Sequence, residues 1–250
     1  MGALDGKRVL LHAPINSGSL YFDYKQQHSI VLLALVDAHY RFMYIDVGAN
    51  GRQSDAGVYA NSNLSGALET NALNFPPATT IPGTTVKSPF MIVADDAFPM
   101  KTYMLKPYPG RLYDDRNSRI FNYRLSRARR FVENAFGIVV SRWRVLRGRM
   151  MVGPQVAQQV VLAVCVLYNF LTKPEEVCST YLPPGMADTA DSDGRITNGS
   201  WRLDSSPKES WQSLPQQGNR GHCVSAKEVR DNCRDFFNGI GRVAWQNDMI

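Results

Sequence analysis

Hydrophobic residues occur first in short continuous runs, which predict buried strands. Residues 28–37 are almost entirely apolar, as is typical of a strand covered on both faces, and residues 41–48 continue as a second strand after a short turn. Together they predict a hairpin. Residues 1–11 also have strand character, although the polar run Asp5-Gly6-Lys7-Arg8 interrupts them, and the apolar residues 90–94 predict one more strand.

Hydrophobic residues further along the chain recur at helical spacing. Residues 118–146 predict a long helix, and residues 155–171 predict a second, strongly apolar one. Ser54 is a typical N-cap for a helix that we expect to continue to about residue 68, and a capping box opens a short helix at 225–237. The buried stripe of the long helix consists of Leu125, Ala128, Val132, Ala135, Phe136 and Val139.

Strands followed by helices, with an apolar hairpin among them, predict an α/β fold in which a mixed sheet is flanked by helices. A chain of 250 residues with 44% hydrophobic content can bury a core of this kind. We assign residues 1–172 to one domain. Pro, Ser, Gly, Asp and Asn dominate residues 173–224, which predicts a disordered linker, and we expect a short C-terminal helix and tail over residues 225–250.

The charge and the cysteine content narrow the choice of partner and compartment. A net charge of +6 favours a polyanion such as a nucleic acid as the partner. The four cysteines form no CxxC pair and no zinc-type spacing, which favours a reducing compartment. The longest apolar run, 160–171, is short for a bilayer span, and the amino end lacks the features of a signal peptide. We therefore expect a soluble, intracellular chain with no membrane partner.

One acid, Glu133, lies in the most basic segment of the chain. From Arg119 to Arg149 there are nine arginines, no lysine, no aspartate and this single glutamate. An acid among arginines on a helix is most often an ion-pair partner at the surface, which contributes little to stability. The more specific alternative is a metal-binding carboxylate within a surface that binds polyanions. The choice depends on whether other carboxylates lie close to it.

Two aspartates upstream can join this glutamate. Asp95 directly follows the strand at 90–94, and ligands collect at the carboxyl ends of strands in α/β sheets. Asp5 interrupts a strand, where aspartate is disfavoured. Taken alone, each is better explained as a turn residue. Taken with Glu133, 38 positions after Asp95, they form a trio whose mutual repulsion Mg²⁺ or Mn²⁺ would relieve, and two such ions can cleave a phosphodiester bond.

Several short motifs occur along the chain in a fixed order. They are Leu4-Asp5-Gly6-Lys7, Tyr21-Phe22-Asp23-Tyr24-Lys25, Gly51-Arg52-Gln53-Ser54-Asp55, Asp95-Asp96-Ala97-Phe98-Pro99, Phe121-Asn122-Tyr123-Arg124, Val132-Glu133-Asn134-Ala135-Phe136-Gly137 and Val164-Cys165-Val166-Leu167-Tyr168-Asn169-Phe170. With these motifs the chain resembles the catalytic domain of PIF/Harbinger-type transposases, which belong to the DDE superfamily and have a ribonuclease H-like fold. The similarity covers about residues 4–171 and returns at residues 243–246.

The resemblance implies that Asp5, Asp95 and Glu133 are the catalytic acids and the ligands of a divalent metal, Mg²⁺ or Mn²⁺. Asp55 also matches a position that is commonly acidic in the family, which we interpret as support for the turn into the helix. The implied activity is that of a DNA endonuclease of transposase descent, which cleaves phosphodiester bonds with two metal ions. The arginines expected to contact DNA phosphates are Arg127, Arg129, Arg130 and Arg142.

The resemblance further implies a nuclear protein whose partners are DNA, a Myb-like DNA-binding protein and a second copy of the chain. Without its partner we expect the chain in the cytoplasm. Only four residues precede Asp5, where the family carries a helix-turn-helix region, so we expect a truncated copy or a piece of a longer protein. Arg8 stands where the family commonly has histidine.

Truncation supports a second functional class, a catalytically inactive or domesticated transposase that acts as a DNA- or partner-binding protein. The presence of all three acids favours the nuclease instead. An unrelated phosphohydrolase has less support, because the sequence has no phosphate-binding P-loop, HExxH or GxSxG motif.

Overall fold

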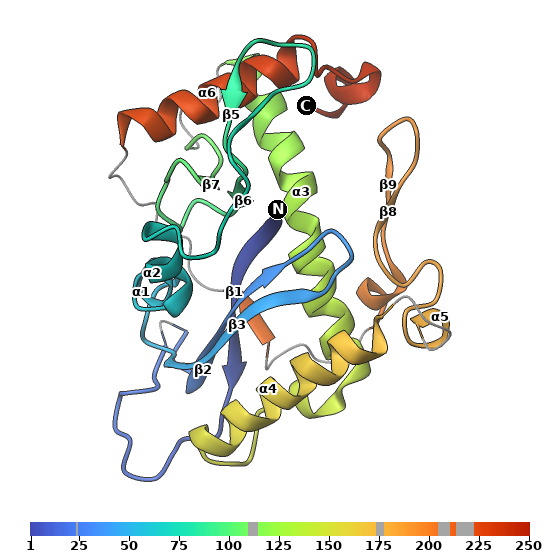
Figure 1. Ribbon diagram of the computed structural model, residues 1–250. Coiled ribbons are helices and arrows are strands. Elements are labelled where there is room, and N and C mark those ends of the chain that lie inside the picture. The colour runs from blue at the N-terminus through green and yellow to red at the C-terminus, as the bar shows by residue number, and fades with distance from the viewer. Residues whose placement is uncertain (24, 110–114, 174–177, 205–210, 214–222) are drawn as a thin grey trace.

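A mixed sheet with helices on both faces forms the centre of the molecule (Figure 1). The computed structural model describes residues 1–23, 25–109, 115–173, 178–204, 211–213 and 223–250. Within them, five strands follow the order β3-β2-β1-β6-β7 across the sheet. They are β1 (Gly2–Leu10), β2 (Ser29–Val36), β3 (Phe42–Asn50), β6 (Ile92–Val93) and β7 (Met104–Leu105). The α/β class predicted from the sequence is confirmed.

The hairpin predicted from the two apolar runs is formed by the antiparallel strands β2 and β3. Every residue of β2 is buried, because helices cover the sheet on both faces. β1 is a continuous strand that pairs antiparallel with β2, and Asp5 does not interrupt it. β6 pairs with β1, and β7 with β6, in the parallel sense.

Two pairs of helices cover the two faces of the sheet. α3 (Arg116–Arg142) and α4 (Pro154–Leu171) contribute to the core on one face, and α1 (Asp55–Ala60) and α2 (Asn63–Glu69) contribute to the core on the other. α6 (Val224–Asn238) crosses one end of the long helix α3, as Figure 1 shows. α3 is thus the element that joins the sheet to the C-terminal part of the chain.

Alternate residues of β1 point into the two cores. Ala3 packs in the core under α3 and α4, whereas Leu4 packs in the core under α1 and α2. Asp5 and Lys7 therefore face α3. In agreement, the Lys7 ammonium group lies 5.7 Å from the centre of the Phe136 ring.

Polar side chains set where the helices begin, and they explain two differences from the predicted bounds. Ser54 caps α1 as predicted. Ser62 accepts the N–H of Ser65 at 3.2 Å and opens α2, so the single helix predicted to reach residue 68 is divided into two. The Asp115 carboxylate caps α3, which therefore begins before the predicted start.

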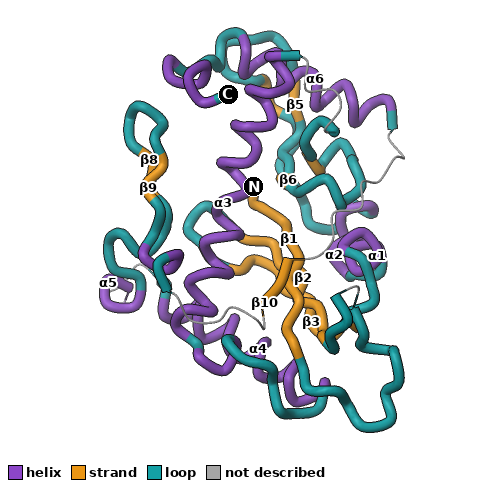
Figure 2. The backbone as a smooth tube through the Cα atoms, turned by 180° about the vertical axis from the view of Figure 1, so that it is seen from behind, coloured by secondary structure: helices purple, strands orange, loops and turns teal. Residues whose placement is uncertain are grey.

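The far edge of β1 is shared by two strands. β6 pairs with Gly2 and Ala3 at the beginning of β1, and β10 (Trp211–Ser213) pairs antiparallel with its last residues, from Lys7 to Val9. Figure 2 shows β10 beside β1 from behind. Asp5 lies where one neighbour ends and before the other begins. Ligands commonly bind α/β sheets at such points, where neighbouring strands diverge.

Within the segment expected to be a linker, 173–224, residues 178–204 form defined elements beside α3. Residues 174–177, 205–210 and 214–222 of that prediction lie outside the described residues. This segment contains α5 (Cys178–Tyr181), the hairpin of β8 (Thr189–Ala190) and β9 (Ile196–Thr197), and the 3-10 turn η2 (Ser200–Arg202). The remaining short elements are β4 (Thr79–Thr80), β5 (Lys87–Ser88), η1 (Arg144–Leu146) and η3 (Ala244–Met249).

A buried carboxylate, Asp188, holds this segment on α3. It accepts hydrogen bonds from the guanidinium groups of Arg130 at 3.1 Å and Arg202 at 2.6 Å. Beside it, Trp201 donates its indole N–H to the side chain of Asn134 in α3 at 2.7 Å. We call Asp188 with Arg130 and Arg202 the Asp188 clamp. The polar composition of the segment did not predict it, because its partner on α3 is distant in the sequence.

α4 is the one helix in the described ranges that is long and apolar enough to cross a membrane, judged by length and composition. Asn169 near its end exchanges two hydrogen bonds with the backbone of Phe42 in β3, at 2.9 and 2.8 Å. One face of the helix is buried in the core of the molecule. The residues of that face are Ala157, Val161, Val164, Cys165 and Tyr168.

Replacing the clamp carboxylate tests its contribution to the fold. We expect Asp188→Asn to lower the free energy of unfolding by about 2–3 kcal/mol, because two arginines lose the charge that pairs with them. Urea denaturation measures the loss. Asp193→Asn makes the same change at an exposed position nearby and should alter stability by less than about 0.5 kcal/mol. Equal stability of Asp188→Asn and the wild type would contradict the clamp.

Candidate active site

Two carboxylates meet where β1 and β6 run parallel. The register pairs Ala3 with Val93, and Asp5 and Asp95 each follow two residues further on, Asp95 just after the end of β6. The two carboxylates are close enough for the charge of Asp5 to raise the pKa of Asp95. Both are buried, with 7% and 5% of their surface exposed. Each carboxylate accepts one nearby backbone N–H at 2.9 Å. Two aspartates that the hairpin of β2 and β3 and the helices α1 and α2 separate in the sequence are therefore brought together by a strand pairing.

A buried lysine fixes the loop that follows Asp95. Lys106, directly after β7, donates to the carbonyl oxygens of Asp96 at 2.8 Å and Phe98 at 3.1 Å. Its ammonium group also pairs with the Asp96 carboxylate at 3.0 Å. Lys106 therefore neutralises Asp96, the second acid of the Asp95-Asp96 pair, and not Asp95.

A third acid, Asp55, belongs to the same cluster. It is the first residue of α1, and only 2% of its surface is exposed. Burial first, and then the charges of Asp5 and Asp95, raise the pKa of the Asp55 carboxyl from 3.8 to about 8. Its oxygen Oδ1 is buried and accepts no hydrogen bond from the described part of the chain. A buried oxygen of this kind is rare in folded proteins and calls for a partner.

Arg129 of α3 acts on this cluster from the helix. Burial and the negative charge of Asp5 raise the pKa of Asp95, and the Arg129 guanidinium opposes them. The Nε atom of Arg129 is buried and makes no hydrogen bond with any residue that the structure describes. The positive charge of Arg129 thus lies near the carboxylates, and its Nε–H group is a hydrogen-bond donor without a partner in the described structure.

Glu133 stands apart from the two aspartates. Its side chain is 38% exposed, and its carboxylate lies 3.9 Å from the guanidinium of Arg202, which is itself bound to Asp188. Over the described residues, Glu133, Asp5 and Asp95 do not come together as a group that could hold a metal ion. Glu133 nevertheless follows Arg129 by one turn on the helix that covers Asp5. Of the three acids implied by the resemblance, Asp5 and Asp95 are therefore neighbours, whereas the Glu133 carboxylate is paired with Arg202.

The donor set suits a hard divalent cation. Over the described ranges, no three His, Cys, Asp or Glu side chains are close enough, as they stand, to hold one metal ion. Carboxylate oxygens are nonetheless the ligands that Mg²⁺ and Mn²⁺ prefer, and the unpartnered Oδ1 of Asp55 gives such an ion a buried donor. A cation would also relieve the repulsion that raises the pKa values of Asp55 and Asp95.

Three of the four arginines predicted to contact DNA already have partners within the protein. Only Arg129 among them keeps a buried donor without a partner in the described ranges. A guanidinium that is paired or stacked inside the molecule is less available to a phosphate than one that is not. The partners are the Asp188 carboxylate for Arg130 at 3.1 Å, the Trp245 ring for Arg127 at 4.3 Å and the Tyr181 ring for Arg142 at 5.6 Å.

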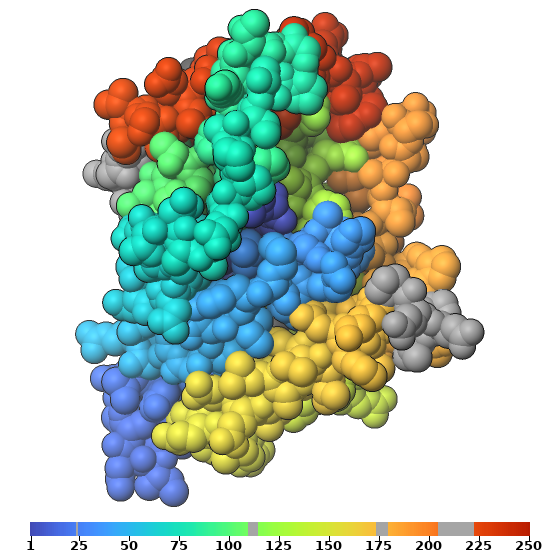
Figure 3. Space-filling view, viewed as in Figure 1, coloured from blue at the N-terminus to red at the C-terminus, as the bar shows by residue number. Residues whose placement is uncertain are grey.

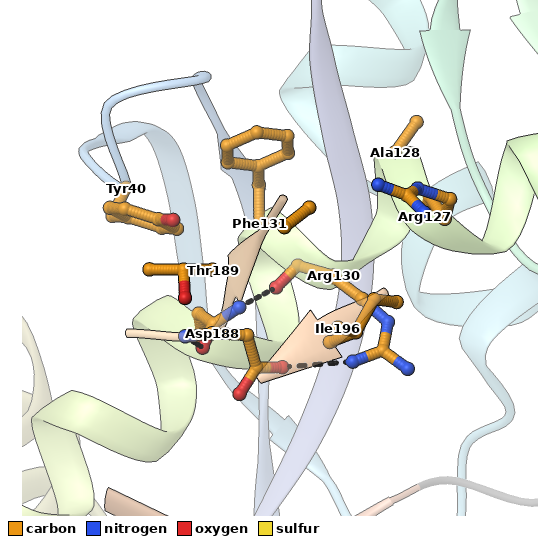
Figure 4. Close-up of a pocket in the computed structure, with 10 residues that line it drawn as sticks. Tyr40, Arg127, Ala128, Arg130, Phe131, Asp188, Thr189 and Ile196 are labelled. Carbon is orange, nitrogen blue, oxygen red and sulfur yellow. Dashed lines mark hydrogen bonds and ion pairs between the residues drawn. The ribbon is translucent and has the colours of Figure 1, made fainter. Parts of the chain in front are cut away.

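A pocket of about 470 Å³ lies between α3, the β8–β9 hairpin and the turn that joins β2 to β3. Figure 4 shows the rings of Tyr40 and Phe131 on one side of it and the side chains of Arg127 and Arg130 on the other. These residues of α3 lie on a different side of the helix from Val132, which packs in the core. Asp5, Asp55 and Asp95 are not among the residues that line this pocket, so it is distinct from the carboxylate cluster.

The cluster of acids lies in a part of the chain that is similar to a known protein family. The family model described as DDE superfamily endonuclease matches residues 4–169, well over half of the chain. This chain belongs to the DDE superfamily endonuclease family. The resemblance inferred from the sequence motifs is confirmed at this level. No solved structure matches the chain.

Two curated proteins are similar to this member of the DDE superfamily. "Protein ALP1-like" of Arabidopsis thaliana is 27% identical over 179 residues, which cover 70% of this chain and 43% of the relative. "Putative nuclease HARBI1" of Xenopus laevis is 23% identical over 172 residues, which cover 68% of this chain and 45% of the relative. The alignments thus span less than half the length of both relatives.

The three acids lie inside the region that matches the family model, and Asp188 and Arg202 lie outside it. Asp5, Asp95 and Glu133 all lie within the part that matches the DDE superfamily model. Asp188 and Arg202, which hold Glu133 to one side, lie beyond it. In this DDE-family chain the position of Glu133 is therefore influenced by a segment outside the matched region.

Sequence reasoning assigned Asp55 to a helix turn and did not place it with the other acids. An aspartate after an N-cap serine is common, because it interacts favourably with the helix dipole. Nothing in the local pattern distinguishes such a residue from one that is buried beside two other carboxylates. The raised pKa of Asp55 arises only because the fold brings the start of α1 close to Asp5 of β1 and to Asp95 after β6.

The raised pKa of Asp55 makes stability depend on pH. Between pH 3.8 and about 8, the folded chain holds a proton that the unfolded chain has released, so stability falls as the pH rises through this window. We expect Asp55→Asn to melt at a higher temperature than the wild type above pH 8, and the difference to disappear near pH 3.8. Thermal unfolding measured across this range checks it.

Asp37→Asn provides a control of opposite sign. Burial alone would raise the pKa of Asp37, but hydrogen bonds from Arg41 and His39 hold it below 3.8. Its contribution to stability is therefore present above pH 3.8 and lost as the pH falls through the folded pKa. Asp37→Asn should lower the melting temperature at neutral pH. A pH-independent effect of Asp55→Asn would mean that the buried acidic cluster does not exist.

Proposed function

We propose that this chain is a divalent-metal-dependent DNA endonuclease of transposase descent. The observation that supports this most strongly is the pair of buried carboxylates Asp5, in β1, and Asp95, two residues after the end of the parallel strand β6, which act electrostatically on one another. Membership of the DDE superfamily endonuclease family supports a nuclease, as does similarity to a relative whose name includes that activity. Asp55 adds a buried oxygen to the proposed site.

Each acid has a distinct role in this proposal. Asp5 and Asp95 would hold Mg²⁺ or Mn²⁺, and the unpartnered oxygen of Asp55 would add a ligand. When bound, the metal supplies activation of the attacking oxygen and stabilisation of the leaving oxygen of a phosphodiester. Glu133 would complete the set by a side-chain rotation away from Arg202, since the two are only 3.9 Å apart and both are partly exposed.

DNA is the proposed substrate, because the chain carries a net charge of +6 and a phosphate needs a cation beside the acids. We place Arg129 first among the phosphate contacts, because its Nε–H group is a hydrogen-bond donor without a partner in the described structure. Arg127, Arg130 and Arg142 remain in the proposal as outer contacts. A Myb-like DNA-binding partner and a nuclear location also belong to it.

A second candidate function is a DNA- or partner-binding protein without catalytic activity. The contact of Glu133 with Arg202 favours it, because this contact keeps the third acid away from the aspartates. The two functions differ in one respect that can be measured. A nuclease needs the aspartates for turnover, whereas a binding protein needs only its positive charge.

Cleavage of supercoiled plasmid DNA in the presence of Mn²⁺ tests the proposal. We expect Asp5→Asn and Asp95→Asn each to lower the rate about 100-fold or more, because loss of a ligand should exceed the effect of losing groups that merely support a metal. Asp193→Asn, an exposed change of the same kind, should cleave like the wild type.

Binding measured on the same samples separates the two functions. Both aspartate variants should still bind DNA, since each loses a negative charge and keeps the arginines. Wild-type protein that binds DNA but leaves it intact with Mn²⁺ would support the binding protein and contradict the nuclease. Cleavage that persists in both variants would show that another site is responsible.

A further inference from the structure

The pocket between α3 and the β8–β9 hairpin has two sides of different chemistry. The rings of Tyr40 and Phe131 lie on one side, with their centres 5.3 Å apart, and the side chains of Arg127 and Arg130 lie on the other (Figure 4). In Figure 3 the hairpin, in orange, lies beside the tip of the turn that joins β2 to β3, in blue. The volume of about 470 Å³ is typical of a pocket for a small ligand. Rings and arginines together suit a ligand that combines a flat ring with an anion.

Tyr40 has a backbone conformation that tyrosine seldom adopts. Its φ is +64°, in the left-handed region that is unfavourable for a residue with a Cβ atom. Strain of this kind often marks a residue with a function. Burial first, and then the charge of Asp188, raise the pKa of Tyr40, so its hydroxyl group stays protonated at neutral pH. This group has no hydrogen-bond partner in the described part of the chain and can therefore donate to a ligand.

Arg127 is oriented by contacts that use only part of its guanidinium group. Its Nη1 atom donates to the carbonyl oxygen of Gly194 in the loop of the hairpin, and the group stacks on the Trp245 ring at 4.3 Å. Its Nη2 and Nε atoms make no hydrogen bond with the residues that the structure describes. Stacking makes Arg127 less available to a DNA backbone outside the pocket. It also fixes the guanidinium beside the pocket, where two donors remain for one anion.

Positive charge exceeds negative charge around the pocket. Asp188 is the one acid among its described lining residues, and Arg130 at 3.1 Å and Arg202 at 2.6 Å bind it. Arg127 adds a third positive charge, whereas Glu133 adds a second negative charge through its contact with Arg202. The three arginines therefore exceed the two acids by one charge. A ligand with a single phosphate suits this pocket, because a buried charge is stable when it is paired.

We propose that this pocket binds one unpaired nucleotide, with its base on the rings of Tyr40 and Phe131 and its phosphate at Arg127. Nucleotides combine a flat ring with a phosphate, and bases commonly stack on aromatic side chains. Both faces of a base inside a duplex are covered by its neighbours, so only an unpaired base can stack in this way. The proposal goes beyond the nuclease function, because it requires neither the acids nor a metal. The nucleotide comes from a nucleic acid strand or is free in solution.

Titration calorimetry of the full chain in the presence of EDTA tests the pocket, because EDTA keeps metals away from the carboxylate cluster. The probes are dAMP, deoxyadenosine, inorganic phosphate, a short dA strand and the same strand in a duplex. We expect the wild type to bind dAMP about 10-fold more tightly than deoxyadenosine or inorganic phosphate, since only dAMP has both parts of the ligand. Asp5→Asn, which changes the carboxylate cluster, should bind dAMP like the wild type.

Variants of the two sides of the pocket locate the binding. Phe131→Ala and Tyr40→Asn should each weaken dAMP binding about 10-fold, because each removes a ring, and asparagine tolerates the backbone at position 40. Phe131→Tyr keeps a ring and should bind like the wild type. Phe170→Ala, which removes an exposed ring of α4, is the matched control and should also bind like the wild type. Arg127→Gln should lose the preference for dAMP over deoxyadenosine.

Two results would support the proposal and identify the source of the nucleotide. If Phe131→Ala weakens binding of the dA strand and leaves binding of the duplex unchanged, the nucleotide belongs to an unpaired stretch of nucleic acid. If it weakens binding of dAMP alone, the ligand is a free nucleotide.

Other results would overturn the proposal. Equal affinity of the wild type for inorganic phosphate and dAMP would show a site for anions only, and this comparison needs no variant. Wild-type affinity of both Phe131→Ala and Tyr40→Asn for every probe, with melting temperatures equal to the wild type, would exclude stacking in the pocket. Absence of plasmid cleavage would contradict the nuclease and leave these results as they stand, so the two proposals fail separately.

Discussion

The parallel pairing of β1 with β6 is the constraint on which the candidate site depends. It sets Asp5 beside Asp95, at the point on the edge of β1 between β6 and β10. Neighbouring buried carboxylates repel one another, so the pKa of Asp95 is raised first by burial and then by the charge of Asp5. The pairing with β2, which is buried along its whole length, holds β1 in place despite this cost. Groups whose pKa values are perturbed by burial and by specific neighbours are typical of functional sites.

The long helix α3 serves the site and the rest of the fold with different faces. Arg129 lies toward the acids, where its charge lowers the electrostatic cost of the aspartate pair. Arg130 binds Asp188, and Arg127 stacks on Trp245 of the C-terminal tail. Much of the positive charge of this helix is therefore used inside the molecule. A count of arginines in the sequence overstates the charge that this helix can offer to DNA.

The sequence predicted the parts of the structure that depend on local pattern. The hairpin of β2 and β3, the N-cap at Ser54 and the courses of α3 and α4 all follow from periodicity and capping. The pairing of Asp5 with Asp95 came from the family resemblance, since no local rule sets the register of two strands so distant in sequence. Asp55 and the clamp at Asp188 were missed for the same reason, because each depends on contacts with residues far away in the chain. Glu133 has the expected residue type on the expected helix, but a partner on another segment decides where its carboxylate lies.

The central claim is that the acids form one cation site, and Mn²⁺-dependent thermal stability tests it most directly. An ion that binds only the folded chain raises its melting temperature, by an amount equivalent to about 2.7 kcal/mol at 100 times the dissociation constant. The account predicts such a rise for the wild type and its loss in both Asp5→Asn and Asp95→Asn, with the exposed Asp193→Asn control responding like the wild type. An equal rise in all four proteins, or none in any of them, would contradict the account.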